Sequence, residues 1–249
     1  MLCWGGFGAW SVYTLLFGAA FGAVTTLRGV TNIAALNCGP MSYTSVIISF
    51  FTLISALSGV LFFGETLGWA QIVGMVLMLA SFVLAAKSDG KGKRSNGKWL
   101  VLCLVAFLAT GGIGLMQKVH QGSAHRDELN AFLITAFISA SVFCSAVVYV
   151  LKKRAGRSAQ TADQAPRRPY LLLLIMLISG FCVAANHRFN LYLSGIMNSA
   201  VFFPIVNGGG LVLTTIAAVT VFRERLVKKQ WVGLILGIAS VVFLCDPFS

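Results

Sequence analysis

The chain has 249 residues, of which 57% are hydrophobic and only 10% are charged. A soluble globular domain carries roughly 25% charged residues to cover its wet surface, so this composition excludes that class. In a soluble protein the formal net charge of +12 would indicate nucleic-acid binding. In so apolar a chain it indicates membrane orientation instead, and we expect no nucleic-acid partner.

The charged residues fall in short clusters that separate long charge-free runs. A bilayer core of about 30 Å is crossed by roughly 20 apolar residues in a helix, whereas open strands would leave backbone groups unpaired in lipid. We therefore predict an all-α, polytopic membrane helix bundle with about eight transmembrane helices. In chain order the predicted helices cover residues 10–36, 39–63, 68–86, 99–117, 130–151, 169–195, 198–222 and 229–245.

Two hydrophilic linkers, 87–98 and 152–169, are rich in Gly, Ser, Pro or charged residues and should be flexible and solvated. Eight helices put both termini on one face, and they put these linkers and the basic turn 223–229 on the other. Most of the Lys and Arg residues lie on the linker face. The basic residues that fall on the terminal face are Lys118, Arg126 and Arg188. The positive-inside rule then makes the linkers cytoplasmic and places both termini outside the cell membrane.

The chain contains an internal repeat at a constant offset of 159 residues. Residues 62–84 read FFGETLGWAQIVGMVLMLASFVL, and residues 221–243 read VFRERLVKKQWVGLILGIASVVF. The matched pairs are Phe63 and Phe222, Glu65 and Glu224, Leu67 and Leu226, Gln71 and Gln230, Gly74 and Gly233, Ala80 and Ala239, and Ser81 and Ser240. The second copy lies five helices after the first. Because five is odd, the two copies have opposite orientations in the membrane.

The Glu-x-Leu boundary followed by Gln and Gly in an apolar helix, present in both copies, resembles the drug/metabolite transporter superfamily of the EamA type. That resemblance implies ten helices in two five-helix inverted repeats, and secondary transport of a small metabolite by alternating access. Residues 99–249 supply a complete second repeat, residues 88–98 a cytoplasmic linker, and residues 1–87 only three helices of the first repeat. We therefore expect the first two of ten helices to be missing, by N-terminal truncation or in a natural short form.

Polar side chains at membrane depth are costly and usually face a cavity or the bundle interior. Arg28 lies one turn before Asn32, and with one gap it aligns with Arg188 of the sixth helix. Since an arginine keeps its charge, we hypothesise that Arg28 and Arg188 bind an anionic or zwitterionic solute, such as an amino acid. The alternative is snorkelling or a structural bond to backbone carbonyls. The candidate substrate-binding residues are Arg28, Asn32, Asn186, His187, Arg188, Asn190 and Asn207.

Asn207 is followed by three glycines, 208–210, shortly after Pro204. Glycines in a membrane helix permit either close helix packing or a local break that exposes carbonyl groups to a solute. Two further glycine pairs predict packing faces, within one monomer or in a homodimer: Gly18-x3-Gly22 and Gly233-x3-Gly237.

His120 and His125 are expected in a solvated polar loop, without the clustered spacing of metal ligands. His187 is the membrane histidine, and no acid lies near it in the sequence. We therefore predict no catalytic residues, no metal and no cofactor. The predicted partners are a small-molecule substrate and the lipid bilayer, and a homodimer stays open. A membrane-embedded enzyme and a non-transporting scaffold are the alternative functions.

Overall fold

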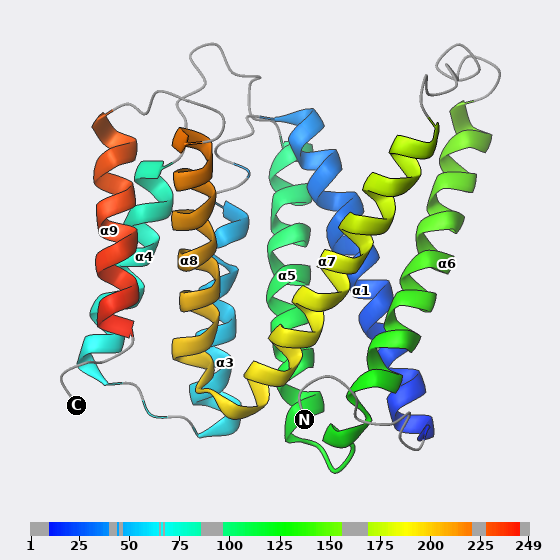
Figure 1. The fold of residues 1–249 in the computed structure, drawn as a ribbon, viewed down its shortest axis with the longest axis horizontal. Coiled ribbons are helices and arrows are strands. Elements are labelled where there is room, and N and C mark those ends of the chain that lie inside the picture. The colour runs from blue at the N-terminus through cyan, green and yellow to red at the C-terminus, as the bar shows by residue number, and fades with distance from the viewer. Residues whose placement is uncertain are drawn as a thin grey trace. The chain divides into compact units, whose positions relative to one another are not determined.

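The structure is a computed structural model, and its described residues form α-helices and a short 3-10 helix. It describes residues 10–39, 44, 47–64, 66, 68–85, 97–155, 169–220 and 228–244. The helices in chain order are α1 (Val12–Cys38), α3 (Phe51–Phe63), α4 (Trp69–Ala85), α5 (Gly97–Gly122), the 3-10 helix η1 (Arg126–Glu128), α6 (Leu129–Ala155), α7 (Pro169–Ile196), α8 (Ser199–Thr220) and α9 (Lys228–Leu244) (Figure 1).

Within the described residues the predicted helices are confirmed in type and in order, but several of their bounds differ. The predicted helix 39–63 is interrupted, because Phe50 is in a turn between helical residues 47–49 and α3. The end of α3 is set by Gly64, whose φ of 64° is left-handed and whose backbone N–H donates to the carbonyl of Gly59. Such a cap satisfies a carbonyl that the helix itself leaves unpaired. Another difference is α5, which continues past the predicted residue 117.

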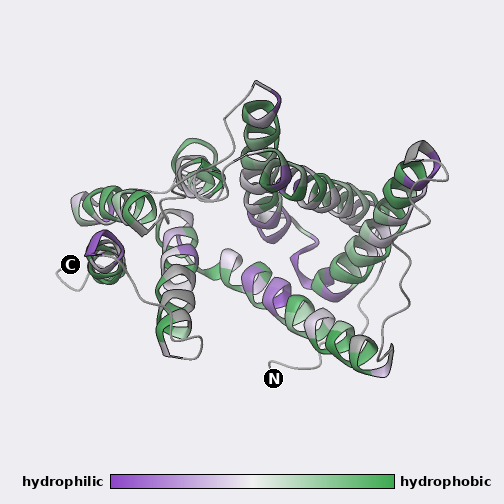
Figure 2. Cartoon of the chain, turned by 90° about the horizontal axis from the view of Figure 1, so that it is seen from above, coloured by the Kyte–Doolittle hydropathy of each residue, from purple (hydrophilic) through white to green (hydrophobic). Residues whose placement is uncertain are grey.

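Among the residues that the structure describes, four helical segments are long and apolar enough to cross a bilayer, and Figure 2 shows apolar residues along most of the helices. They are Val12–Cys38, Gly97–Gly122, Arg126–Lys153 and Leu173–Ile196. Shorter apolar helical segments cover Trp69–Leu84 and Val201–Gly210. The chain is therefore a multi-span helical membrane protein.

The helices form two compact units that do not follow the order of the chain. One unit comprises Met1–Thr26 with Val119–Gly195, and the other comprises Leu27–Lys118 with Ile196–Ser249. The unit boundaries fall inside α1 and α5 and at the end of α7. Each unit therefore combines parts of both predicted repeats.

In the first unit, α1 packs closely against α6 through small residues. A Cβ atom on Gly22 would lie 2.4 Å from the carbonyl oxygen of Ala136, so only glycine fits there. Three residues earlier on α1, the carbonyl oxygen of Ala19 accepts a 2.8 Å hydrogen bond from the hydroxyl of Ser139. The Gly18-x3-Gly22 face is thus a packing face within the monomer, as is common between membrane helices.

In the second unit, α4 and α9 pack against each other through the repeated Gly and Ser positions. The Ser81 hydroxyl donates a 2.6 Å hydrogen bond to the carbonyl oxygen of Gly233. Conversely, a Cβ atom on Gly74 would lie 3.1 Å from the carbonyl oxygen of Ser240. The early residue of each helix thus faces the late residue of the other, so the two helices run antiparallel. Gly237 also belongs to this contact, since a Cβ there would lie 2.9 Å from the Ser81 hydroxyl.

Several sequence predictions fall outside the described residues. The repeat positions concerned are Glu65, Leu67, Phe222, Glu224 and Leu226. Most of both predicted linkers also lies outside. At their edges, however, the structure is helical: α5 begins at Gly97, and α6 continues to Ala155.

Candidate solute-binding site

The polar segment of α7 presents two asparagines one helical turn apart. The Asn190 side-chain amide donates to both the backbone carbonyl and the side-chain oxygen of Asn186, each at 2.9 Å. Asn186 is exposed and Asn190 is half-buried. The two amides therefore form one continuous polar strip on α7.

Arg188 lies between these asparagines in the sequence and reaches across to α6. Its Nη1 atom donates a short hydrogen bond to the side-chain oxygen of Asn130, in the first turn of α6. The half-buried guanidinium is thereby held against the neighbouring helix. An amide oxygen is a neutral acceptor, so this bond orients the guanidinium without supplying a negative charge.

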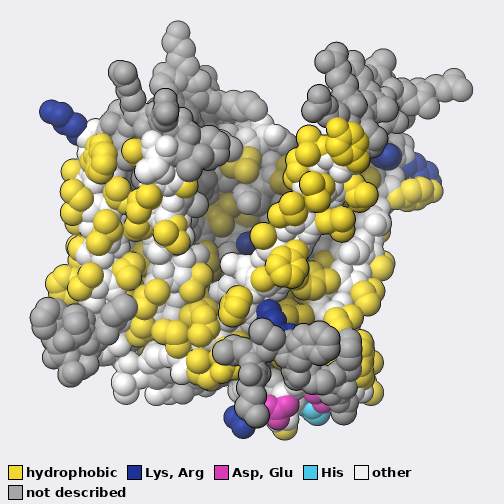
Figure 3. Space-filling view, viewed as in Figure 1, with side chains coloured by type: hydrophobic (Ala, Val, Ile, Leu, Met, Phe, Trp, Pro, Cys, Tyr) yellow, Lys and Arg dark blue, Asp and Glu magenta, His cyan; other side chains and the backbone are white. Residues whose placement is uncertain are grey.

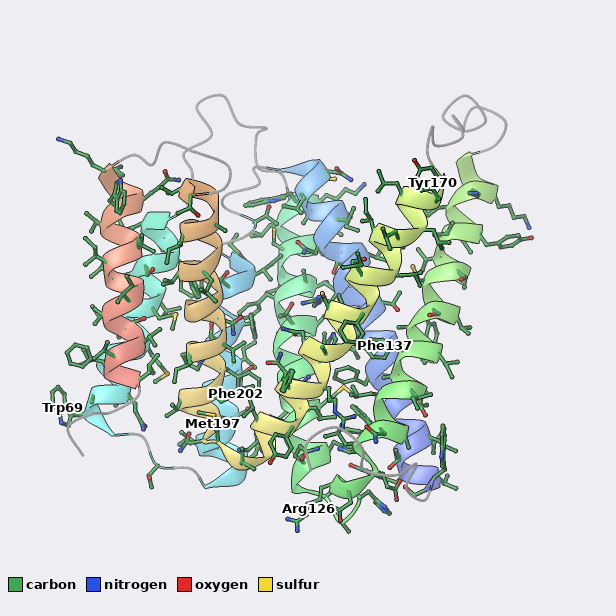
Figure 4. All side chains as sticks on the ribbon, viewed as in Figure 1. Trp69, Arg126, Phe137, Tyr170, Met197 and Phe202 are labelled. Carbon is green, nitrogen blue, oxygen red and sulfur yellow. The ribbon has the colours of Figure 1, made fainter. Side chains whose placement is uncertain are left out.

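His187 sits where α1, α6 and α7 meet within the first unit. Its ring makes edge-to-face contacts with Phe21 of α1, at a centroid distance of 6.0 Å, and with Phe137 of α6, at 5.8 Å. Phe137 is labelled in Figure 4. Such T-shaped pairs are favourable arrangements for aromatic rings. His187 therefore packs against the rings of Phe21 and Phe137, and the neighbouring Arg188 binds the side-chain amide of Asn130 on α6.

The remaining predicted site residues belong to the second unit. Arg28 is exposed and Asn32 is half-buried, one turn apart on α1. Asn207 is on α8, where its side-chain amide donates a 2.7 Å hydrogen bond to the carbonyl oxygen of Phe203. That carbonyl is four residues back on the same helix, so the bond holds the Asn207 amide along the helix surface.

In the glycine run beside Asn207, close packing is seen at Gly208. The helix α8 is continuous from Ser199 to Thr220 and contains no break at the glycines. A Cβ atom on Gly208 would lie 2.4 Å from the sulfur of Met78 on α4, whereas Gly209 and Gly210 have no such neighbour. Of the two roles that the sequence left open, the structure supports packing at Gly208.

No protein-family model matches this sequence. The chain is 26% identical over 196 residues to an uncharacterised protein of Haemophilus influenzae, which covers 76% of this chain and 60% of that protein. It is 33% identical over 108 residues to solute carrier family 35 member F6 of Rattus norvegicus, covering 43% of this chain and 28% of the rat protein. The chain is a distant homologue of a solute carrier.

The chain spans less than two thirds of the length of either relative. A protein of known crystal structure shares its fold, with a TM-score of 0.63 and 14% identity over 92% of this chain and 84% of that one. At that identity the likeness concerns the fold alone. The comparisons therefore show a distant similarity to a solute carrier over less than half of this chain.

One sequence prediction is wrong. His120 is not in a solvated loop, because α5 extends far enough to include it and its side chain has no exposed surface. His125 does lie in the turn, half-buried, with its Nδ1 atom 3.0 Å from a Glu128 carboxylate oxygen. Within the described ranges, no three His, Cys, Asp or Glu side chains come together in a way that suits a metal ion.

Sequence reasoning also missed Asn130 as the partner of Arg188. The two residues are 58 positions apart on the consecutive helices α6 and α7, and hydrophobicity along the chain does not show which side chains of two helices meet. The available signal was a lone amide in the first turn of an otherwise apolar helix, since such a group is costly at membrane depth unless it is bonded.

Proposed function

We propose that this protein is a secondary transporter that moves a small anionic or zwitterionic metabolite, such as an amino acid, across the cell membrane. Transport proceeds by alternating access between two EamA-like inverted repeats, residues 1–87 and 99–249. The linker 88–98 is cytoplasmic, and both termini are on the outer side. The solute-binding residues are Asn186, His187, Arg188 and Asn190 in the first unit and Arg28, Asn32 and Asn207 in the second.

The observation that carries this proposal is the reciprocal packing of α4 with α9. Ser81 contacts Gly237, and the repeat mates of these residues, Ser240 and Met78, also meet: the Ser240 hydroxyl lies 3.9 Å from the Met78 sulfur. Each residue of the first contact is thus replaced, in the second contact, by the residue 159 positions away in the other copy. A local two-fold rotation that exchanges two antiparallel helices produces such a pair of contacts. An axis of this kind, lying in the membrane plane, relates inverted repeats in secondary transporters.

The chemistry of α7 supports an anionic group on the solute. Arg188 is permanently charged and lies in a candidate membrane span, Leu173–Ile196. Beside it, His187 and the Asn186–Asn190 amide pair offer additional hydrogen-bonding groups. A carboxylate suits this set, because a guanidinium binds a carboxylate through two parallel hydrogen bonds.

The rat relative supports the class of activity, since it is named as a solute carrier. We carry that class of activity over to this chain.

The test is uptake by purified protein in proteoliposomes, with a panel of labelled amino acids and small carboxylates. Among the solutes that wild-type protein moves, we expect Arg188→Gln and Arg28→Gln to reduce uptake by about tenfold or more, because a hydrogen bond to a charged group contributes about 1.5–3 kcal/mol. Arg126→Gln is the matched control, because Arg126 is an exposed arginine in η1 (Figure 4). It should leave uptake unchanged.

Two results would contradict the proposal. Wild-type protein that moves none of the panel above empty liposomes would remove the transport function for these solutes. Uptake that persists unchanged in both Arg188→Gln and Arg28→Gln would remove the assigned site and leave the transport class standing.

A further inference from the structure

His120 is a fully buried imidazole enclosed by aromatic rings in the first unit. Its ring centroid lies 4.3 Å from that of Phe132 on α6 and 6.4 Å from that of Phe17 on α1. The side chain has no exposed surface. The ring therefore fills the space between α1, the end of α5 and the start of α6.

The hydrogen bonding of this imidazole is incomplete. Its Nδ1 atom is 3.5 Å from the side-chain amide nitrogen of the adjacent Gln121, at the outer limit of a hydrogen bond. Its Nε2 atom is buried and has no hydrogen-bond partner among the described residues. Because the Gln121 amide is a donor, the Nδ1 atom accepts and the Nε2 atom carries the proton. A neutral ring tolerates this arrangement better than a charged one, since an imidazolium adds a charge and a second N–H group.

The elements around His120 carry few charges that could stabilise a cation. The part of α1 in this unit has no Lys, Arg, Asp or Glu and contributes the phenol of Tyr13, and α6 has no such residue before Lys152. The charged residue of α7 is Arg188, whose guanidinium donates a hydrogen bond to Asn130 of α6. In and beside η1, the charged and titratable residues are His125, Arg126, Asp127 and Glu128, and Figure 3 shows acidic and histidine side chains gathered at this end.

The carboxylate of Glu128 interacts electrostatically with His120, but it already accepts hydrogen bonds from other residues. Its carboxylate accepts hydrogen bonds from the backbone N–H of Ser11 at 3.1 Å and from the Ser11 hydroxyl at 2.7 Å. It also meets His125 at 3.0 Å. The ring of His125 in turn stacks on Tyr13, with centroids 5.1 Å apart. These contacts hold the start of α1 against the turn that follows α5. This turn lies close to His120 and to the cage that Phe17 and Phe132 form around it.

We propose that His120 is a proton-binding site, and that its protonation releases the first turns of α1 from α5 and α6. The faces of Phe17 and Phe132 attract a cation, but they do not replace the water and the hydrogen-bond acceptors that an imidazolium requires. Water reaches the ring only if α1, which contributes Phe17, moves away. An unperturbed histidine titrates near neutral pH, so acidification on this face of the membrane is the signal that the site detects.

The inference goes beyond the proposed transport function and is tested without any solute. Amide hydrogen exchange is measured on the purified protein in nanodiscs at about pH 5.5 and about pH 7.5, with correction for the chemical exchange rate. In wild-type protein we expect exchange in residues 12–24 to become about tenfold faster at the lower pH, while the α4 and α9 peptides stay unchanged.

Two variants identify the responsible group. His120→Phe keeps an aromatic ring in the cage and removes the titrating atoms, so the acid response of residues 12–24 should disappear. His120→Gln provides a second non-titrating side chain, should the phenylalanine variant fail to fold. His125→Gln is the matched control, and its acid response should persist.

Retention of the full acid response in His120→Phe or His120→Gln would overturn the proposal, as would a wild-type protein whose α1 exchange does not change with pH. A response lost in His125→Gln and kept in the His120 variants would assign the effect to His125 instead. A failed transport assay does not affect any of these outcomes.

Discussion

The Ser81 hydroxyl in α4 donates a 2.6 Å hydrogen bond to the carbonyl oxygen of Gly233 in α9, and the repeat mates of these two residues, Ser240 and Gly74, also face each other. The two contacts are not equal in chemistry. The Ser240 hydroxyl donates to the carbonyl of Gly237 in its own helix, at 2.7 Å. The pair of helices is thus symmetric in packing and asymmetric in hydrogen bonding.

This asymmetry predicts different costs for two equivalent substitutions. Ser81→Ala removes a hydrogen bond between helices and should lower the free energy of unfolding by about 0.5–1.5 kcal/mol. Ser240→Ala removes a bond within one helix and a weak 3.9 Å contact with the Met78 sulfur, and it should cost less. Thermal unfolding in detergent measures both, with Ser141→Ala, at an exposed position of α6, as the control. Equal losses for Ser81→Ala and Ser240→Ala would show that the interhelical bond contributes nothing.

The close approach of α1 to α6 predicts that Gly22 tolerates no side chain. In Gly22→Ala the new Cβ atom would lie 2.4 Å from a backbone oxygen of α6, so the helices must separate at a cost of about 1–3 kcal/mol. Gly29→Ala on the same helix is the control, because no atom lies within 4 Å of a Cβ there. We expect a clearly lower melting temperature for Gly22→Ala and an unchanged melting temperature for Gly29→Ala. A Gly22→Ala protein as stable as wild type would contradict the α1–α6 packing.

The bond between Arg188 and Asn130 allows the charge of the site to be changed without loss of packing. Asn130→Asp places a carboxylate against the guanidinium, and the resulting ion pair competes with an anionic solute. Under the proposed function, uptake should fall about tenfold or more while the melting temperature is kept or raised. Asn130→Ser, which keeps a neutral acceptor, is the comparison variant and should transport better than Asn130→Asp. An aspartate variant with normal uptake would argue against a role for the Arg188 charge.

The contacts of Glu128 predict that it holds the start of α1 in place. Glu128→Gln removes the negative charge that accepts two hydrogen bonds from Ser11, so the first turn of α1 should exchange its amide hydrogens faster and the melting temperature should fall. Asp127→Asn is the control, because Asp127 is exposed in the same 3-10 helix. If both variants show the same exchange in residues 12–16, Glu128 does not hold α1.

The positions of the helices were predictable because they depend on local composition. Each run such as 99–117 or 198–222 is long, apolar and free of charge, and in lipid such a run can satisfy its backbone only as a helix. The antiparallel relation of α4 and α9 was also predictable, since the second copy lies five helices after the first and five is odd. The exact end of α5 was not, because polar residues such as His120 continue a helix whenever neighbouring helices bury them.

By itself, the amino-acid sequence determined that this is a helical membrane protein with a repeated Gly and Ser pattern and charged residues within its spans. Only the tertiary structure decided which side chains meet: Glu128 with Ser11, 117 residues apart, Arg188 with Asn130, and His120 with Phe132. The physical reason is that hydrophobicity and period act along the chain. Contacts between helices depend instead on the rotation of each helix about its own axis, and that rotation is set by the packing of all its neighbours together.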